Sequence, residues 1–165
     1  GIKNPIDIAC GDYGHSHSLD GASTRKLDEI LDVCLRKRFT VVVVDVPVLS
    51  AVRLSTKGAF DTVLVTYSLC TIFDLVAALR EMRRVLKPGG QLIYCEHGIA
   101  PDAGVRRWQQ KLTPTWSKIA GGCHMDRDIP ALLREAGFAT QDLQAMYLPG
   151  PRILTYNYWG TATAV

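Results

Sequence analysis

Hydrophobic residues gather in short runs that alternate with segments of helical spacing, and the clearest such unit spans Phe60–Gly98. Phe60–Leu69 is apolar and rich in β-branched residues, which is typical of a strand buried on both faces. The next segment has apolar residues at helical spacing, namely Leu75, Ala78, Leu79, Met82, Val85 and Leu86. Lys87-Pro88-Gly89-Gly90 then predicts a turn and Gln91–Glu96 a second buried strand. The pattern therefore predicts a βαβ unit with parallel, neighbouring strands.

The N-terminal part predicts further strands and a helix of the same kind. Ile6–Gly14 (IDIACGDYG) indicates a strand that runs into a glycine-bearing turn, where small residues let the backbone approach a ligand. The spacing predicts a helix over Ser23–Arg38, capped by Ser23 or Thr24, and a buried strand over Phe39–Val46. Asp45 stands near the carboxyl end of that strand, the edge at which α/β sheets bind ligands.

The C-terminal part predicts two helices and two strands. A helix is expected over Pro101–Gly122, interrupted at Pro114, with an apolar side of Val105, Trp108, Leu112, Trp116 and Ile119. We expect a second helix over Ile129–Ala136. Strands over Thr140–Leu148 and Ile153–Thr163 follow. Trp108 and Trp116 are candidates for a pocket wall, although aromatic residues at helical spacing more often belong to a core.

Composition narrows the class of protein. The chain has 165 residues, of which 47% are hydrophobic and 21% charged, so we expect one soluble domain over 1–165 with an α/β, doubly wound sheet. The net charge of +3 is small and the basic residues fall mainly in two helices, which argues against a nucleic-acid partner. No run is long enough to span a membrane, and no signal peptide is visible. The five cysteines form no Cys-x-x-Cys pair, which favours reduced thiols in a cytoplasmic protein.

His15, His17 and Cys10 are the residues that first suggest a metal site. Alternate residues of an extended segment point to opposite sides, so His15 and His17 suit chelation poorly. No further ligand cluster follows them in the sequence. We therefore expect a polar loop here and no metal.

Two stretches carry a resemblance to a known family. FDTV, the apolar run after it, LREMRRVLKPGG and the following strand resemble the second half of class I methyltransferases that use S-adenosylmethionine (SAM). EHGIAPDAGVRRWQQKLTPTWSKIAGGCHMDRDIPALLREAGF resembles a subgroup that contains bacterial small-molecule enzymes and mammalian membrane-associated thiol methyltransferases. The likeness covers about Phe60–Ala164. It implies a Rossmann-like, mostly parallel sheet that ends in an antiparallel hairpin.

The resemblance also implies a cofactor site. SAM would be held near the carboxyl ends of the early strands by Asp7, Ala9, Gly11, Gly14, Asp20, Asp45, Val46 and Thr66. The alternating acidic and small residues of the family's first turn are matched by Asp7, Ala9 and Gly11. Tyr13 stands where a third glycine often lies, and Gly14 comes one residue late.

The chain departs from the family between Gly14 and Phe60, where one strand and one helix are missing. In one alignment Phe39–Asp45 is the second strand and Asp45 binds the ribose hydroxyls. In the other, which we prefer, Phe39–Val46 is the third strand, Asp45 and Val46 flank the adenine, and Asp20 is the ribose acid. A sheet that lacks an internal strand must close the gap or leave backbone groups unpaired.

The function that the sequence favours is methyl transfer from SAM to a small-molecule acceptor, of which a thiol is one candidate. His97 and His124 are the candidate general bases, since imidazole exchanges protons near neutral pH. Asp126 and Asp128 either overhang the acceptor or cap the next helix.

The alternative function is a non-catalytic methyltransferase-like module that has lost part of the cofactor site. A dinucleotide-binding oxidoreductase fits the second half less well. An exposed sheet edge would also allow a homodimer.

Overall fold

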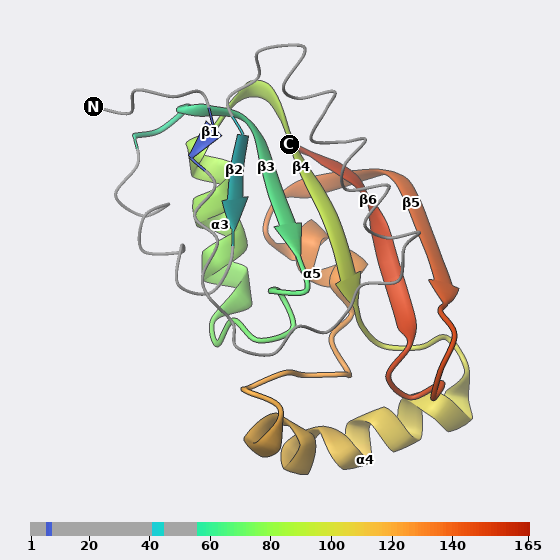
Figure 1. The fold of residues 1–165 in the computed structure, drawn as a ribbon. Coiled ribbons are helices and arrows are strands. Elements are labelled where there is room, and N and C mark those ends of the chain that lie inside the picture. The colour runs from blue at the N-terminus through green and yellow to red at the C-terminus, as the bar shows by residue number, and fades with distance from the viewer. Residues whose placement is uncertain (1–5, 8–40, 45–55) are drawn as a thin grey trace.

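A computed structural model describes residues 6–7, 41–44 and 56–165, and its strands form one sheet in the order β1-β2-β3-β4-β6-β5 (Figure 1). The strands are β1 (Ile6–Asp7), β2 (Val41–Val44), β3 (Phe60–Thr66), β4 (Leu86–His97), β5 (Phe138–Tyr147) and β6 (Tyr156–Ala164). The helices are α3 (Leu75–Val85), α4 (Ala103–Ile119) and α5 (Ile129–Glu135). None of the helices in these ranges is long and apolar enough to cross a membrane.

Strand directions confirm the predicted α/β sheet. The strands from β1 to β4 are parallel to their neighbours, with Val42 opposite Val63 and Val63 opposite Leu92. β6 runs antiparallel to β4, and β5 runs antiparallel to β6, so the chain ends in the expected hairpin. Parallel neighbours end at the same edge, which gathers the loops after β3 and β4 there.

The core lies on one face of this sheet, beneath α3 and α5. Asp74 caps α3 by accepting a hydrogen bond from Ala77 N at 3.1 Å. The apolar stripe predicted for the helix is buried, with Leu79 and Met82 at 0% exposure, and it packs with Leu92 and Tyr94 of β4 and Leu133 of α5. Burying that stripe is the main term that holds the helix against the sheet.

The predicted turn at Lys87–Gly90 is a bulge inside a longer strand. Phe60 pairs with Leu86 and Thr62 pairs with Gln91, so four residues of β4 lie opposite a single residue of β3. Gly89 has a φ of 77°, and a Cβ on Gly90 would lie 2.9 Å from Asp61 O. The two glycines therefore make the bulge possible.

The prediction for α4 was wrong in its buried face. The helix runs through Pro114 without a break and lies beyond the carboxyl ends of β3 and β4 (Figure 1). Its buried residues are Gln109 and Thr113, whereas Trp108 is 54% and Ile119 76% exposed. Gln109 is buried because its amide accepts a hydrogen bond from Ala100 N and donates to Gly98 O and Ile153 O.

The position of β2 differs from both alignments considered above. β2 pairs directly with β3, and β1 pairs with β2. In a doubly wound sheet the strand beside the fourth is the first, not the second or third. Direct pairing of β2 with β3 leaves no gap between the two strands, which satisfies the backbone groups that a missing strand would expose.

Asp128, and not Asp126, caps α5. The Asp128 carboxylate accepts a hydrogen bond from Ala131 N at 3.0 Å. We expect Asp128→Ala to lower the free energy of unfolding by about 1 kcal/mol, measured by urea denaturation, because it leaves a helix N–H without its partner. Asp126→Ala is the matched control and should change it by less than about 0.5 kcal/mol. Equal losses in the two variants would contradict the cap.

Candidate functional site

The loop after β3 is fastened to the end of β4 by a buried carboxyl group. Glu96 is 0% exposed, and its Oε1 accepts hydrogen bonds from Ser68 N at 2.8 Å and Leu69 N at 3.1 Å. Tyr67, where the chain leaves β3, has a φ of 47°, a conformation that side-chain-bearing residues rarely adopt. The loop therefore has a defined shape, and it places Cys70 beside the end of β4.

Two sulfurs and one imidazole meet at this edge of the sheet. The reactive atoms of Cys70, His97 and Cys123 all lie within 4.8 Å of one another, and His97 Nε2 is 3.1 Å from Cys123 Sγ. Cys70 is 3% exposed, while His97 and Cys123 are half-buried. We call these three residues the Cys-His-Cys cluster. Its members come from three separate segments: the loop after β3, the end of β4 and the α4–α5 loop.

The α4–α5 loop is held against the cluster by its backbone. Gly121 and Gly122 have φ values of 59° and 88°, which glycine adopts without strain. His124 N donates a hydrogen bond to Cys70 O at 2.9 Å, which joins the two cysteine-bearing loops directly. The position of Cys123 next to Cys70 is thus set by main-chain geometry.

A hydrogen bond between Cys70 and Cys123 moves the pKa values of the two thiols in opposite directions. Hydrogen bonding to Cys123 and burial raise the pKa of the Cys70 thiol to about 12, whereas the hydrogen bond from Cys70 lowers the pKa of Cys123 to about 7. Burial acts to lower the pKa of His97, but the interactions with Cys70 and Glu96 outweigh it and the net pKa is raised. The cluster therefore brings the pKa of the Cys123 thiol close to neutral pH, well below that of an ordinary cysteine.

Burial raises the pKa of Glu96 to about 8 from an ordinary value of 4.5. The folded chain then keeps a proton that the unfolded chain releases, so this stabilisation is complete below pH 4.5 and is lost as the pH rises through 8. We expect the free energy of unfolding of the wild type to fall relative to that of Glu96→Gln between pH 5 and pH 8. Urea denaturation with a chelator present measures this, and a constant difference would contradict it.

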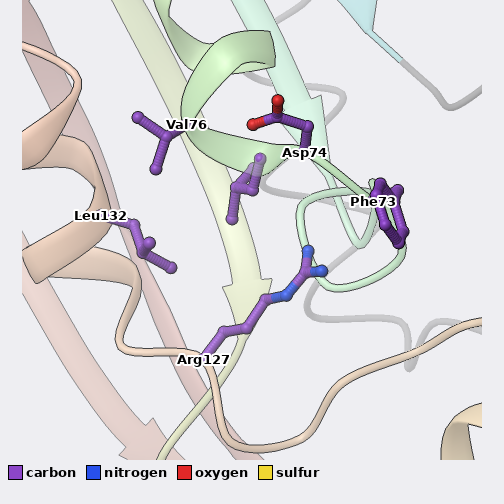
Figure 2. A pocket seen from close by; sticks show the side chains of 6 residues that line it. Phe73, Asp74, Val76, Arg127 and Leu132 are labelled. Atoms are coloured by element: carbon purple, nitrogen blue, oxygen red, sulfur yellow. The ribbon is translucent and has the colours of Figure 1, made fainter.

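Arg127 links the site to a shallow pocket on the surface. Its guanidinium donates a hydrogen bond to Leu69 O, and Figure 2 shows it reaching from the loop before α5 toward the loop before α3. The pocket is lined by Phe73, Asp74, Leu75, Val76, Arg127 and Leu132. Phe73 is fully exposed beside it. The pocket is apolar apart from Asp74 and the Arg127 cation.

The structure separates the two predicted bases. His97 belongs to the cluster, whereas the His124 side chain is 42% exposed and lies 3.9 Å from Asp126 through Nδ1. Sequence reasoning missed Cys70, Cys123 and the buried Glu96 as site residues. The only signal was their place in the strings SLC, CEH and GGCH, which gives no distance between segments far apart in the chain.

Two of the residues that the resemblance assigns to SAM lie within the described ranges, but β2 separates their strands, whereas the first and fourth strands of a doubly wound sheet are neighbours. Thr66 ends β3 and is half-buried, and Asp7 ends β1, so both lie toward the same edge as the cluster. In the sheet, Asp7 pairs with Val42 of β2, and Val42 pairs with Val63 of β3. The other predicted cofactor residues, Ala9, Gly11, Gly14, Asp20, Asp45 and Val46, lie outside the described residues, as do His15, His17 and Cys10.

Known methyltransferases are similar to this chain over part of its length. Thiol S-methyltransferase TMT1B of Rattus norvegicus is 36% identical over 95 residues, which are 57% of this chain and 38% of that protein. Demethylmenaquinone methyltransferase of Corynebacterium urealyticum is 38% identical over 104 residues, 57% of this chain and 45% of that protein. The chain thus spans about two fifths of the length of the curated relatives it matches.

Solved structures and a family model complete the comparison. A SAM-dependent methyltransferase of Methanosarcina mazei superposes with a TM-score of 0.51 at 18% identity, over 67% of this chain and 61% of that one, and so shares the fold. Residues 6–94 match the family described as a methyltransferase domain, which is more than half of the chain. This chain therefore belongs to the class I SAM-dependent methyltransferases.

Proposed function

We propose that this chain transfers the methyl group of SAM to the sulfur of a small thiol. The observation that carries the proposal is the imidazole of His97, held half-buried at the carboxyl end of β4, where its Nε2 lies 3.1 Å from Sγ of the chain's own Cys123. That edge is where α/β sheets bind their ligands. The likeness to the rat thiol S-methyltransferase, at 36% identity over 95 residues, supports the choice of acceptor atom.

For this reaction the protein has to align the acceptor with the methyl group and remove one proton from the acceptor. SAM supplies a methyl group on a sulfonium, which is open to displacement by a thiolate. A thiolate is the nucleophile, not the thiol, so the acceptor must lose its proton first. We assign the removal of that proton to His97, because a positioned imidazole can act as a general base. His124 is the second candidate, and its exposure makes it the weaker one.

A matched acceptor series tests the proposal. The purified chain is given SAM with thiophenol, phenol or aniline, and S-adenosylhomocysteine is measured by mass spectrometry. We expect product with thiophenol only. His97→Asn should lower the rate by about 100-fold, whereas His124→Asn should lower it less than about threefold. Methylation of phenol or aniline at the thiol's rate would contradict the choice of sulfur, and an unaffected His97→Asn would contradict its role.

The cofactor site is tested separately. Calorimetric titration with S-adenosylhomocysteine should show binding to the wild type that is lost in Asp45→Ala and in Gly11→Val, the residues that the resemblance assigns to SAM. A folded sample that binds nothing would favour the alternative, a methyltransferase-like module without catalysis. Binding without turnover of any acceptor would leave the cofactor site in place and contradict the acceptor.

A further inference from the structure

We propose that Cys70, His97 and Cys123 bind one Zn²⁺ ion, with a fourth coordination position left open. Two cysteine sulfurs and one imidazole nitrogen are the ligand set that zinc prefers, and a three-residue set with an open position is the arrangement of catalytic zinc sites. The three ligand atoms lie within 4.8 Å of one another. No other such group of three or more occurs within the ranges that the structure describes.

The distances suit a tetrahedral ion after small movements. Zinc–sulfur bonds of about 2.3 Å and zinc–nitrogen bonds of about 2.05 Å place tetrahedral ligands about 3.5–3.8 Å apart. His97 Nε2 and Cys123 Sγ are 3.1 Å apart, and no pair exceeds 4.8 Å. Each ligand therefore needs to move by roughly 1 Å or less, which rotation about side-chain torsions supplies.

The surroundings already hold the ligands in place. Glu96 fixes the backbone at Ser68 and Leu69, just before Cys70. The hydrogen bond from His124 N to Cys70 O ties the loop of Cys123 to that of Cys70. Thr71 Oγ1 lies 3.4 Å from Cys70 Sγ, within reach of a coordinated thiolate. Such supporting contacts are what orient metal ligands.

Charge also favours a divalent cation at this position. Two half-buried or buried thiolates so close together repel each other and are costly to desolvate. A Zn²⁺ ion neutralises both. The alternative without metal, a thiol and a thiolate beside an imidazole, leaves one sulfur protonated and makes the pair prone to oxidation to a disulfide.

The open position gives the metal a role in the proposed function. A small thiol that binds there loses its proton to solvent and becomes a metal-bound thiolate, the nucleophile that methyl transfer requires. This step rests on the proposed function for the identity of the acceptor, whereas metal binding itself does not. The general-base role proposed for His97 then belongs to the metal-free chain, because with the ion bound the imidazole is a ligand and the ion ionises the acceptor.

Cobalt is the probe that tests the site, because Co²⁺ replaces Zn²⁺ and is coloured. The chain is stripped of metal with a chelator, kept reduced, and titrated with Co²⁺. We expect one ion per chain, visible bands of tetrahedral Co²⁺ and a near-ultraviolet thiolate-to-cobalt band, all removed by added Zn²⁺. Cys70→Ser and Cys123→Ser should each lose about half of the thiolate band, and His97→Asn should weaken binding tenfold or more.

A triple variant provides the control. Replacing Cys10, Cys34 and Cys95 by serine leaves only the two proposed cysteine ligands, and it should keep the full thiolate band. Cys95→Ser alone should behave likewise. Absence of the thiolate-to-cobalt band from the wild-type spectrum would overturn the proposal. This result does not depend on whether the variants fold. A Cys70–Cys123 disulfide that persists in place of metal uptake under reducing conditions would also overturn it.

The acceptor step has its own readout. Added 2-mercaptoethanol should increase the thiolate-to-cobalt band by about half, as a third sulfur joins the ion. No increase would refute the open position for thiols while leaving the metal site intact. If S-adenosylhomocysteine fails to bind but the cobalt spectrum is as expected, the proposed function fails and the metal site stands. If cobalt binding fails while thiophenol is methylated, the metal site fails and the proposed function stands.

Discussion

Replacing Glu96 by alanine should lower the free energy of unfolding by about 2–3 kcal/mol. The side chain is 0% exposed and its Oε1 accepts hydrogen bonds from both Ser68 N and Leu69 N. Without it, two buried N–H groups lose their partner, and each such loss costs about 1–3 kcal/mol, partly offset because a buried carboxyl no longer has to be desolvated. Urea denaturation with an unchanged m-value measures the loss.

Glu96→Gln is the matched control for that experiment. Its amide oxygen can keep the Oε1 position and both hydrogen bonds, so we expect a loss of less than about 1 kcal/mol near pH 7. The second oxygen, Oε2, has no hydrogen-bond partner among the described residues, so the amide nitrogen that replaces it loses no existing bond. If glutamine were as harmful as alanine, the two hydrogen bonds would not be what Glu96 contributes.

The fastening of this loop also bears on function. Cys70 follows Leu69 directly, so loss of the Glu96 hydrogen bonds should move a member of the Cys-His-Cys cluster as well as unfold the chain more easily. Glu96 is thus a positioning residue. We expect Glu96→Ala to reduce cobalt binding at temperatures where the variant is still folded, and Glu96→Gln to retain it.

The sequence was most informative where local rules and packing agree. In Phe60–Gly98, the apolar runs, the helical spacing and the glycines after the helix all predict a βαβ unit, and the structure contains it. The strand boundary was less well predicted. Residues after Thr66 are as apolar as the strand, yet they form the loop that Glu96 holds, because a tertiary hydrogen bond and not hydrophobicity ends the strand.

Two features could not be predicted because they depend on contacts between distant segments. The apolar stripe of α4 predicted a buried Trp108, but Gln109 occupies the interior since three backbone groups from separate loops bind its amide. Likewise, Cys70, His97 and Cys123 are each unremarkable in their own segment. The parallel sheet brings Cys70 and His97 to one edge, and the hydrogen bond from His124 N to Cys70 O adds Cys123 to them.

Gly98→Ala should destabilise the chain by roughly 3 kcal/mol, because a Cβ there has no room. It would lie 2.5 Å from Arg127 O, 3.0 Å from Tyr158 Cε2 and 3.1 Å from Ile129 Cγ1. The first contact is with backbone, and Arg127 O is itself held at 2.9 Å by the N–H of Ile99, so relief requires a shift of the loop before α5. Overpacking that moves main chain costs about 1–3 kcal/mol or more.

Gly104→Ala separates this steric effect from a general effect of losing glycine. Gly104 lies in α4, and a Cβ there meets nothing within 4 Å, so alanine should stabilise the chain by about 0.5–1 kcal/mol through helix propensity. Thermal unfolding of the two variants should therefore shift in opposite directions. Because the displaced loop connects Cys123 to Arg127, Gly98→Ala should also weaken cobalt binding, which Gly104→Ala should leave unchanged. A Gly98→Ala variant as stable as the wild type would show that the loop yields freely, and the backbone contact would then not fix the position of Cys123.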